Sequence, residues 1–128
     1  MIIKPTLVLG ASLKPIRYSN IAIQRLQQYN HPIIAVGLKA GITHGQEVIT
    51  FESAFAKAET HRNTIDTVTL YISPQRQDSY MEYVVSLKPK RVVFNPGTEN
   101  PEFYKVLKEN NIPFEIACTL VLLGTNQY

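Results

Sequence analysis

The sequence predicts a single α/β domain over residues 1–128, built on a mainly parallel, doubly wound five-stranded sheet with helices on both faces. Short apolar runs typical of buried strands alternate at least four times with helical spacing. The chain has 128 residues with no internal repeat or linker, which suits one domain. A domain of this size buries roughly two thirds of its unfolded surface, so neither a disulfide nor a structural metal is required.

The N-terminal part begins with a strand, a helix and a second strand. Residues 6–10 (Thr-Leu-Val-Leu-Gly) form an apolar run closed by glycine, as in a buried strand. Ser19 or Asn20 can cap the next helix, which runs to about residue 29 with apolar residues on one face. Residues 32–37 (Pro-Ile-Ile-Ala-Val-Gly) form the second strand, which also ends in glycine.

The C-terminal half repeats the alternation. Residues 67–72 form a third strand that a Ser-Pro pair ends, and residues 80–87 have the apolar spacing of a helix. Residues 91–94 form a fourth strand, which an Asn-Pro-Gly turn follows. Residues 103–110 then have helical spacing, and residues 113–117 form the fifth strand.

The middle of the chain is harder to interpret, with a short strand at residues 48–49 and a short helix at residues 52–59. Right-handed crossovers between the parallel strands predict the strand order 3-2-1-4-5. Such sheets bind ligands at the carboxyl ends of the strands, at the switch point beside the first strand. We therefore expect the functional residues to follow the strands directly.

The charge of the chain is unevenly distributed. Thirteen basic and ten acidic residues give a net charge of +3, yet five basic residues precede the first acidic one, Glu47. The remaining eight basic residues therefore accompany all ten acidic ones. The basic first third indicates either an exposed basic face or a site for an anion. Nucleic acid is not expected, because the sequence has no Lys/Arg cluster and no basic patch interleaved with aromatic residues.

Other features bound the class of protein. The single cysteine, Cys118, excludes an internal disulfide and a multi-cysteine zinc site, and three dispersed histidines predict no metal site. No apolar run reaches about 18 residues and the N-terminus does not resemble a signal peptide, so we expect a soluble cytoplasmic protein without membrane contact. The apolar segment 119–123 either forms the face of a homodimer or completes the core.

The loop after the first strand has the features of a phosphate site. Gly10 permits a tight turn and a close ligand, and the following helix presents free backbone N–H groups. The dinucleotide pattern Gly-x-Gly-x-x-Gly is absent, because Ser12 and Pro15 replace its later glycines. The acidic residue that NAD requires after the second strand is also absent, and Lys39 lies near that place. Lys39 suits a ribose phosphate, which leaves NADP and coenzyme A (CoA).

Several of these segments together resemble the stand-alone CoA-binding domain family. They are Gly10-Ala11-Ser12 with Pro15, Arg17 and Ser19, then Lys39-Ala40-Gly41, and residues 94–102 (Phe-Asn-Pro-Gly-Thr-Glu-Asn-Pro-Glu). The resemblance covers nearly the whole chain and extends to the related CoA-binding domain of succinyl-CoA synthetase alpha subunits. It implies a Rossmann-like domain that holds CoA or acyl-CoA at the strand ends. Gly37-Leu38 depart from the Asn-Pro that the family often has after the second strand.

The resemblance implies a role for each segment. The loop from Gly10 to Leu13 would hold the pyrophosphate, assisted by residues at the helix start, and residues 72–74 would flank the pantetheine arm. Val36 and Lys39 would lie by the adenosine ribose and its phosphate. The candidate cofactor-binding residues are Gly10, Ala11, Ser12, Leu13, Lys14, Arg17, Ser19, Val36, Lys39, Ile72, Ser73, Pro74, Asn95 and Gly97.

No convincing catalytic set is visible, so no catalytic residue is assigned. His44 is the one histidine expected near the site, and it has no carboxylate partner in the sequence. We therefore expect a CoA or acyl-CoA binding module without its own catalysis. The alternatives are a small NADP-dependent or acyl-transfer enzyme that uses Cys118 or His44, and an interaction module that has lost its ligand.

Overall fold

A computed structural model describes residues 2–128. Their strands form one seven-stranded sheet. Its order is β3-β4-β2-β1-β5-β6-β7, and every neighbouring pair is parallel except the antiparallel pair of β3 and β4. The strands are β1 (Thr6–Ala11), β2 (Ile33–Gly37), β3 (Gly41–Thr43), β4 (Gln46–Thr50), β5 (Thr67–Leu70), β6 (Arg91–Phe94) and β7 (Phe114–Ile116).

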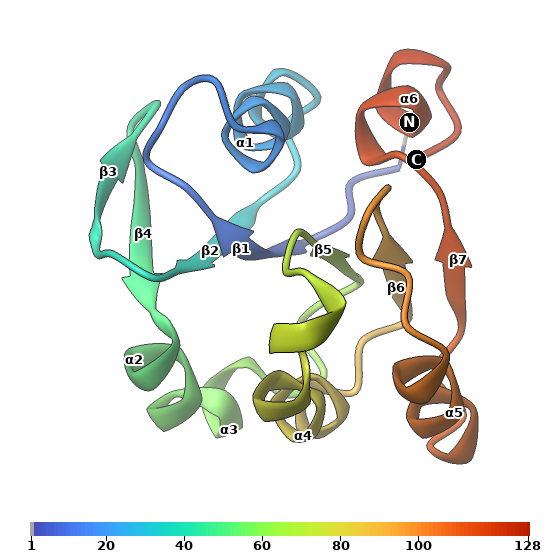
Figure 1. The fold of residues 1–128 in the computed structure, drawn as a ribbon. Helices are drawn as coiled ribbons and strands as arrows, with labels where there is room; N and C mark the ends of the chain where they lie inside the picture. Colours follow the sequence, from blue (N-terminus) through green and yellow to red (C-terminus); the bar gives the residue numbers. More distant parts are fainter. Residues whose placement is uncertain (1) are drawn as a thin grey trace.

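Helices cover both faces of this sheet, as the sequence predicts. They are α1 (Tyr18–Gln28), α2 (Phe51–Ala56), α3 (Ala58–His61), the 3₁₀ turn η1 (Pro74–Arg76), α4 (Asp78–Leu87), α5 (Pro101–Glu109) and α6 (Thr119–Gly124). Figure 1 shows α1 and α6 on one side of the sheet, and α2, α3, α4 and α5 on the other. Among the described residues, no helix is long and apolar enough to cross a bilayer.

The predicted α/β class is confirmed, whereas the predicted number of five strands and their order are wrong. The five predicted strands correspond to β1, β2, β5, β6 and β7, and they lie in the order 2-1-3-4-5. The place beside the second strand belongs to β4, which forms a hairpin with β3 through a turn at His44 and Gly45. Val48 is the only fully buried residue of β4, so the segment has no apolar run that would mark a central strand.

The central strands are buried on both faces and divide the core in two. Leu7 and Leu9 of β1 join the larger cluster under α4 and α5, while Val8 points to the opposite face and packs in a cluster with α1 and α6. Leu123 of α6 is 1% exposed, so segment 119–123 completes this second cluster, although Val121 remains exposed. The predicted helix caps at Ser19 and Asn20 are wrong, because both residues lie buried inside α1.

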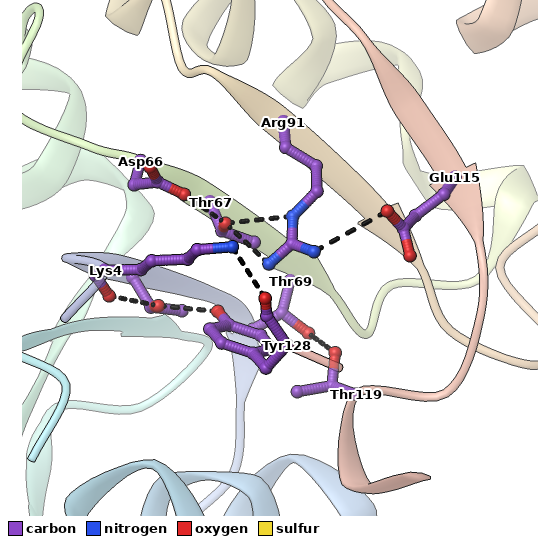
Figure 2. Close-up of polar contacts among 9 residues, drawn as sticks. Lys4, Asp66, Thr67, Thr69, Arg91, Glu115, Thr119 and Tyr128 are labelled. Carbon is purple, nitrogen blue, oxygen red and sulfur yellow. Dashed lines mark hydrogen bonds and ion pairs between the residues drawn. The ribbon is translucent and has the colours of Figure 1, made fainter. Parts of the chain in front are cut away.

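A polar cluster at the amino ends of the strands fixes the last residue, Tyr128 (Figure 2). The Tyr128 ring is 4% exposed, and its hydroxyl shares a hydrogen bond of 2.6 Å with the hydroxyl of Thr6 at the start of β1. The Arg91 guanidinium lies 4.6 Å from the ring centroid, and the ring of His31 lies 5.0 Å away. Lys4 Nζ donates to the main-chain oxygen of Tyr128 at 2.6 Å. These contacts hold Tyr128 against the amino ends of the strands.

Candidate cofactor pocket

A cavity of about 720 Å³ lies at the opposite edge, over the carboxyl ends of the central strands. Its walls come from the segments that follow β1, β2, β5 and β6, together with the first residues of α1 and part of α4. Strands β1 and β5 are neighbours here, and the chain leaves them to opposite faces of the sheet. The cavity therefore occupies the switch point at which the sequence predicts a ligand site.

Two glycines bring the backbone close together beneath the cavity. Gly10 has a φ of +98°, and a Cβ atom there would lie 2.8 Å from the carbonyl carbon and oxygen of Tyr71. A Cβ atom at Gly37 would overlap the carbonyl oxygen of Ala11. Both strand ends thus require glycine, and the loop after β1 can turn directly above the sheet.

The start of α1 faces the cavity without an internal counter-charge. Arg17 occupies the N-cap position, its side chain makes no capping hydrogen bond, and the first turn contains no acidic residue. The first backbone N–H groups of an α-helix lack intrahelical acceptors and carry the positive end of the helix dipole. With Ser12, Arg17 and Ser19 lining the cavity, this helix start is suited to an anion.

Four basic side chains line the cavity and no acidic side chain does: Lys14, Arg17, Lys39 and Arg76. All four are exposed. Within residues 2–128 the one ion pair joins Arg91 to Glu115 at 3.5 Å, far from these four. The cavity is therefore a region of uncompensated positive charge that favours an anionic ligand.

The structure brings most of the predicted binding residues together. Those that line the cavity are Gly10, Ala11, Ser12, Leu13, Lys14, Arg17, Ser19, Val36, Lys39, Ile72, Ser73 and Gly97. Pro74 and Asn95 do not line it. Pro74 begins η1, and Asn95 is 2% exposed with its side chain turned into the protein.

The side chain of Asn95 is fully used inside the protein. Its Nδ2 donates to Thr69 Oγ1 at 2.8 Å and to the Leu70 carbonyl at 2.9 Å, while its Oδ1 accepts from the Thr119 N–H at 2.8 Å. These bonds tie β6 to β5 and to the start of α6. Asn95 therefore has a structural role behind the cavity wall.

Sequence reasoning did not select several lining residues: Tyr18, Gly37, Leu38, Tyr71, Arg76, Tyr80, Pro96 and Thr98. Most of them adjoin selected segments, so the available signal was proximity to a strand end. Burial raises the pKa of the Tyr71 hydroxyl well above its ordinary value, against the effect of a hydrogen bond with Thr69. Tyr71 is therefore protonated at neutral pH.

The residues considered for catalysis lie outside the lining. His44 is in the β3–β4 turn, where its Nε2 lies 2.7 Å from Asn20 Oδ1 and its carbonyl accepts from Gln27 Nε2 at 2.9 Å. Cys118 is half-buried at the N-cap of α6. Neither side chain reaches the cavity. Among the described residues, no group of three or more His, Cys, Asp or Glu side chains could hold a metal ion.

Fold and cavity together define a doubly wound α/β domain with a basic ligand pocket at its switch point. Comparison with family models identifies the family: the model described as "CoA binding domain" matches residues 4–124. The chain thus belongs to the CoA-binding domain family, as the resemblance implied. A search of curated proteins found no match.

Several solved structures share the fold of this chain. An uncharacterized protein is 44% identical over all of both chains, with a TM-score of 0.86. The cell-free ID.343 protein from Thermus thermophilus is 23% identical, with a TM-score of 0.80 over 98% of this chain and 91% of that one. A hypothetical protein from Pyrococcus horikoshii OT3 is 24% identical, with a TM-score of 0.77 over 93% and 80%. The last two show the shared fold alone.

Proposed function

We propose that this protein binds CoA or acyl-CoA in the switch-point cavity and does so without catalysis of its own. The observation that carries the proposal is the convergence of the Gly10 loop, the start of α1 and four unpaired cations on one cavity. CoA has a matching set of anions, a pyrophosphate and a separate phosphate on the adenosine ribose. The cavity volume of about 720 Å³ lies within the usual range for cofactor sites.

The pose follows from the family resemblance and the lining. The pyrophosphate lies over the Gly10 loop and the start of α1, near Lys14 and Arg17. The adenosine ribose phosphate lies by Lys39. The pantetheine arm runs past Ile72 and over the loop after β6. The side chains of Cys118 and His44 do not line the cavity, which favours binding over acyl transfer.

Thermal unfolding with added ligand tests the proposal. A ligand at 100 times its dissociation constant adds about 2.7 kcal/mol to the free energy of unfolding. For a domain of this size, that raises the melting temperature by roughly 10 °C. CoA and acetyl-CoA are the expected stabilising ligands. A clear shift with NADP and none with either CoA form would overturn the proposal, and no shift with any of these nucleotides would favour the interaction module.

Turnover assays with the purified protein address the second half of the proposal. We expect no transfer of the acyl group from acetyl-CoA, either to water or to an amine. A measurable turnover that Cys118→Ser or His44→Ala abolishes would show that the protein is an enzyme. The same two variants are expected to bind CoA as the wild-type protein does, because neither side chain lines the cavity.

A further inference from the structure

Arg76 is a basic residue of the cavity that the family resemblance does not assign. It ends η1, the short turn after β5, and lines the cavity. Three of the four cations come from the loops after β1 and β2, whereas Arg76 comes from across the switch point.

The backbone of Arg76 is held in place by the next residue. The Gln77 side chain is completely buried, and its Nε2 donates to the Ile72 carbonyl and to the Thr98 carbonyl, each at 2.8 Å. Its Oε1 accepts from Asn100 Nδ2 at 3.0 Å. Gln77 thus ties η1 to the loops after β5 and β6. The Arg76 side chain therefore starts from a fixed point on the cavity wall.

The neighbours of Arg76 indicate which end of the cavity it serves. Tyr80, one turn further along, also lines the cavity, and its ring packs against Phe51 with centroids 4.3 Å apart. Phe51 directly follows β4, and β4 is the neighbour of β2 in the sheet. The segment after β2 supplies Lys39. This chain of contacts connects the start of α4, which follows Arg76, with the strands that lead to Lys39.

We propose that Arg76 determines specificity for CoA by binding the adenosine ribose phosphate together with Lys39. This inference rests on the proposed CoA-binding function and adds a second residue to its phosphate site. A terminal phosphate presents several oxygens, and the planar guanidinium can bind two of them at once, while a lysine ammonium acts as a point charge. Two cations that bind one dianionic phosphate discriminate strongly against a ligand without that phosphate, such as dephospho-CoA.

Isothermal titration of the wild-type protein and Arg76→Gln with CoA and dephospho-CoA tests this inference. Arg76→Gln is expected to weaken the binding of CoA at least about tenfold and the binding of dephospho-CoA by less than about twofold. The reason is that it removes a charge-assisted hydrogen-bonding group that only CoA uses. Arg76→Lys should recover part of the lost CoA affinity. Arg62→Gln is the matched control, because Arg62 is exposed and does not line the cavity. This variant should leave the affinity for both ligands unchanged.

The titrations distinguish failure of the proposed function from failure of the role of Arg76. Wild-type protein that binds neither ligand would overturn the proposed function, and this inference with it. Wild-type protein that binds CoA, with Arg76→Gln weakening both ligands equally or neither of them, would overturn the role of Arg76 and leave the function intact. Because Arg76 is exposed, the variant should retain the melting temperature of the ligand-free protein, which shows that any loss of binding is local.

Discussion

Replacing Asn95 by alanine should destabilise the protein and leave the cofactor site of the folded fraction intact. Asn95 is 2% exposed and makes three side-chain hydrogen bonds of 2.8–2.9 Å. Its removal takes a partner from the carbonyl of Leu70 and from the N–H of Thr119, both in a closed interior. Each buried polar group that loses its partner costs about 1–3 kcal/mol. We therefore expect a loss of about 3 kcal/mol and a melting temperature lower by roughly 10–15 °C.

Urea unfolding followed by circular dichroism measures this loss, and an unchanged m-value shows that the folded and unfolded states are otherwise the same. Asn95→Asp keeps the acceptor for the Thr119 N–H but removes both donors, so it should be at least as destabilising. Asn110→Ala is the matched control, because Asn110 is exposed and its single side-chain bond, to the Val106 carbonyl, lies at the surface. Its expected cost is below about 0.5 kcal/mol.

The measurement also decides between two roles for Asn95. The sequence predicts a cofactor contact, and the structure predicts an internal tie between strands. A stability loss below about 1 kcal/mol, combined with lost CoA binding, would refute the structural argument and restore the sequence prediction. A large stability loss with the CoA affinity of the folded protein preserved would support the internal role.

Three further predictions concern the two edges of the sheet. Burial, and then a nearby lysine ammonium, lower the pKa of His31, so the unfolded chain gains a proton below about pH 6.5 before the folded protein does. The free energy of unfolding should therefore be greatest above that pH and fall below it. His31→Asn should reduce this dependence on pH in urea titrations from pH 7 to 5, and an unchanged dependence would contradict the prediction. Tyr128→Phe should lower the free energy of unfolding by about 1 kcal/mol, because its hydroxyl bond to Thr6 is buried; equal wild-type stability would count against this. Gly10→Ala should cost more than about 2 kcal/mol and abolish the CoA-induced thermal shift. Gly45→Ala, at a φ of +74° that is also positive but with open space around its Cβ, should cost about 1 kcal/mol. Equal costs would show that the close approach at Gly10 is unimportant.

Local patterns predicted the main strands and the place of the cavity, because buried parallel strands have continuous apolar runs and their carboxyl ends share one edge. For β4 they indicated only the short strand at residues 48–49 and not its place beside β2, because Val48 is the one fully buried residue of this strand. They also failed to separate Asn95 from its neighbours, because packing decides whether a polar residue at a strand end faces the cavity or the interior. Arg76 was missed for a related reason: only the fold brings η1 to the cavity wall.

The distribution of charge over the fold supports a ligand in the cavity by a separate argument. At the amino edge of the sheet, Arg91 has an internal partner for its charge, since it pairs with Glu115 and lies over the ring of Tyr128. At the carboxyl edge, four cations and the positive end of α1 converge with no acidic residue in the cavity lining. Like charges gathered in this way repel one another. A multiply charged anion, such as the CoA proposed above, would supply the counter-charge for this edge within one molecule.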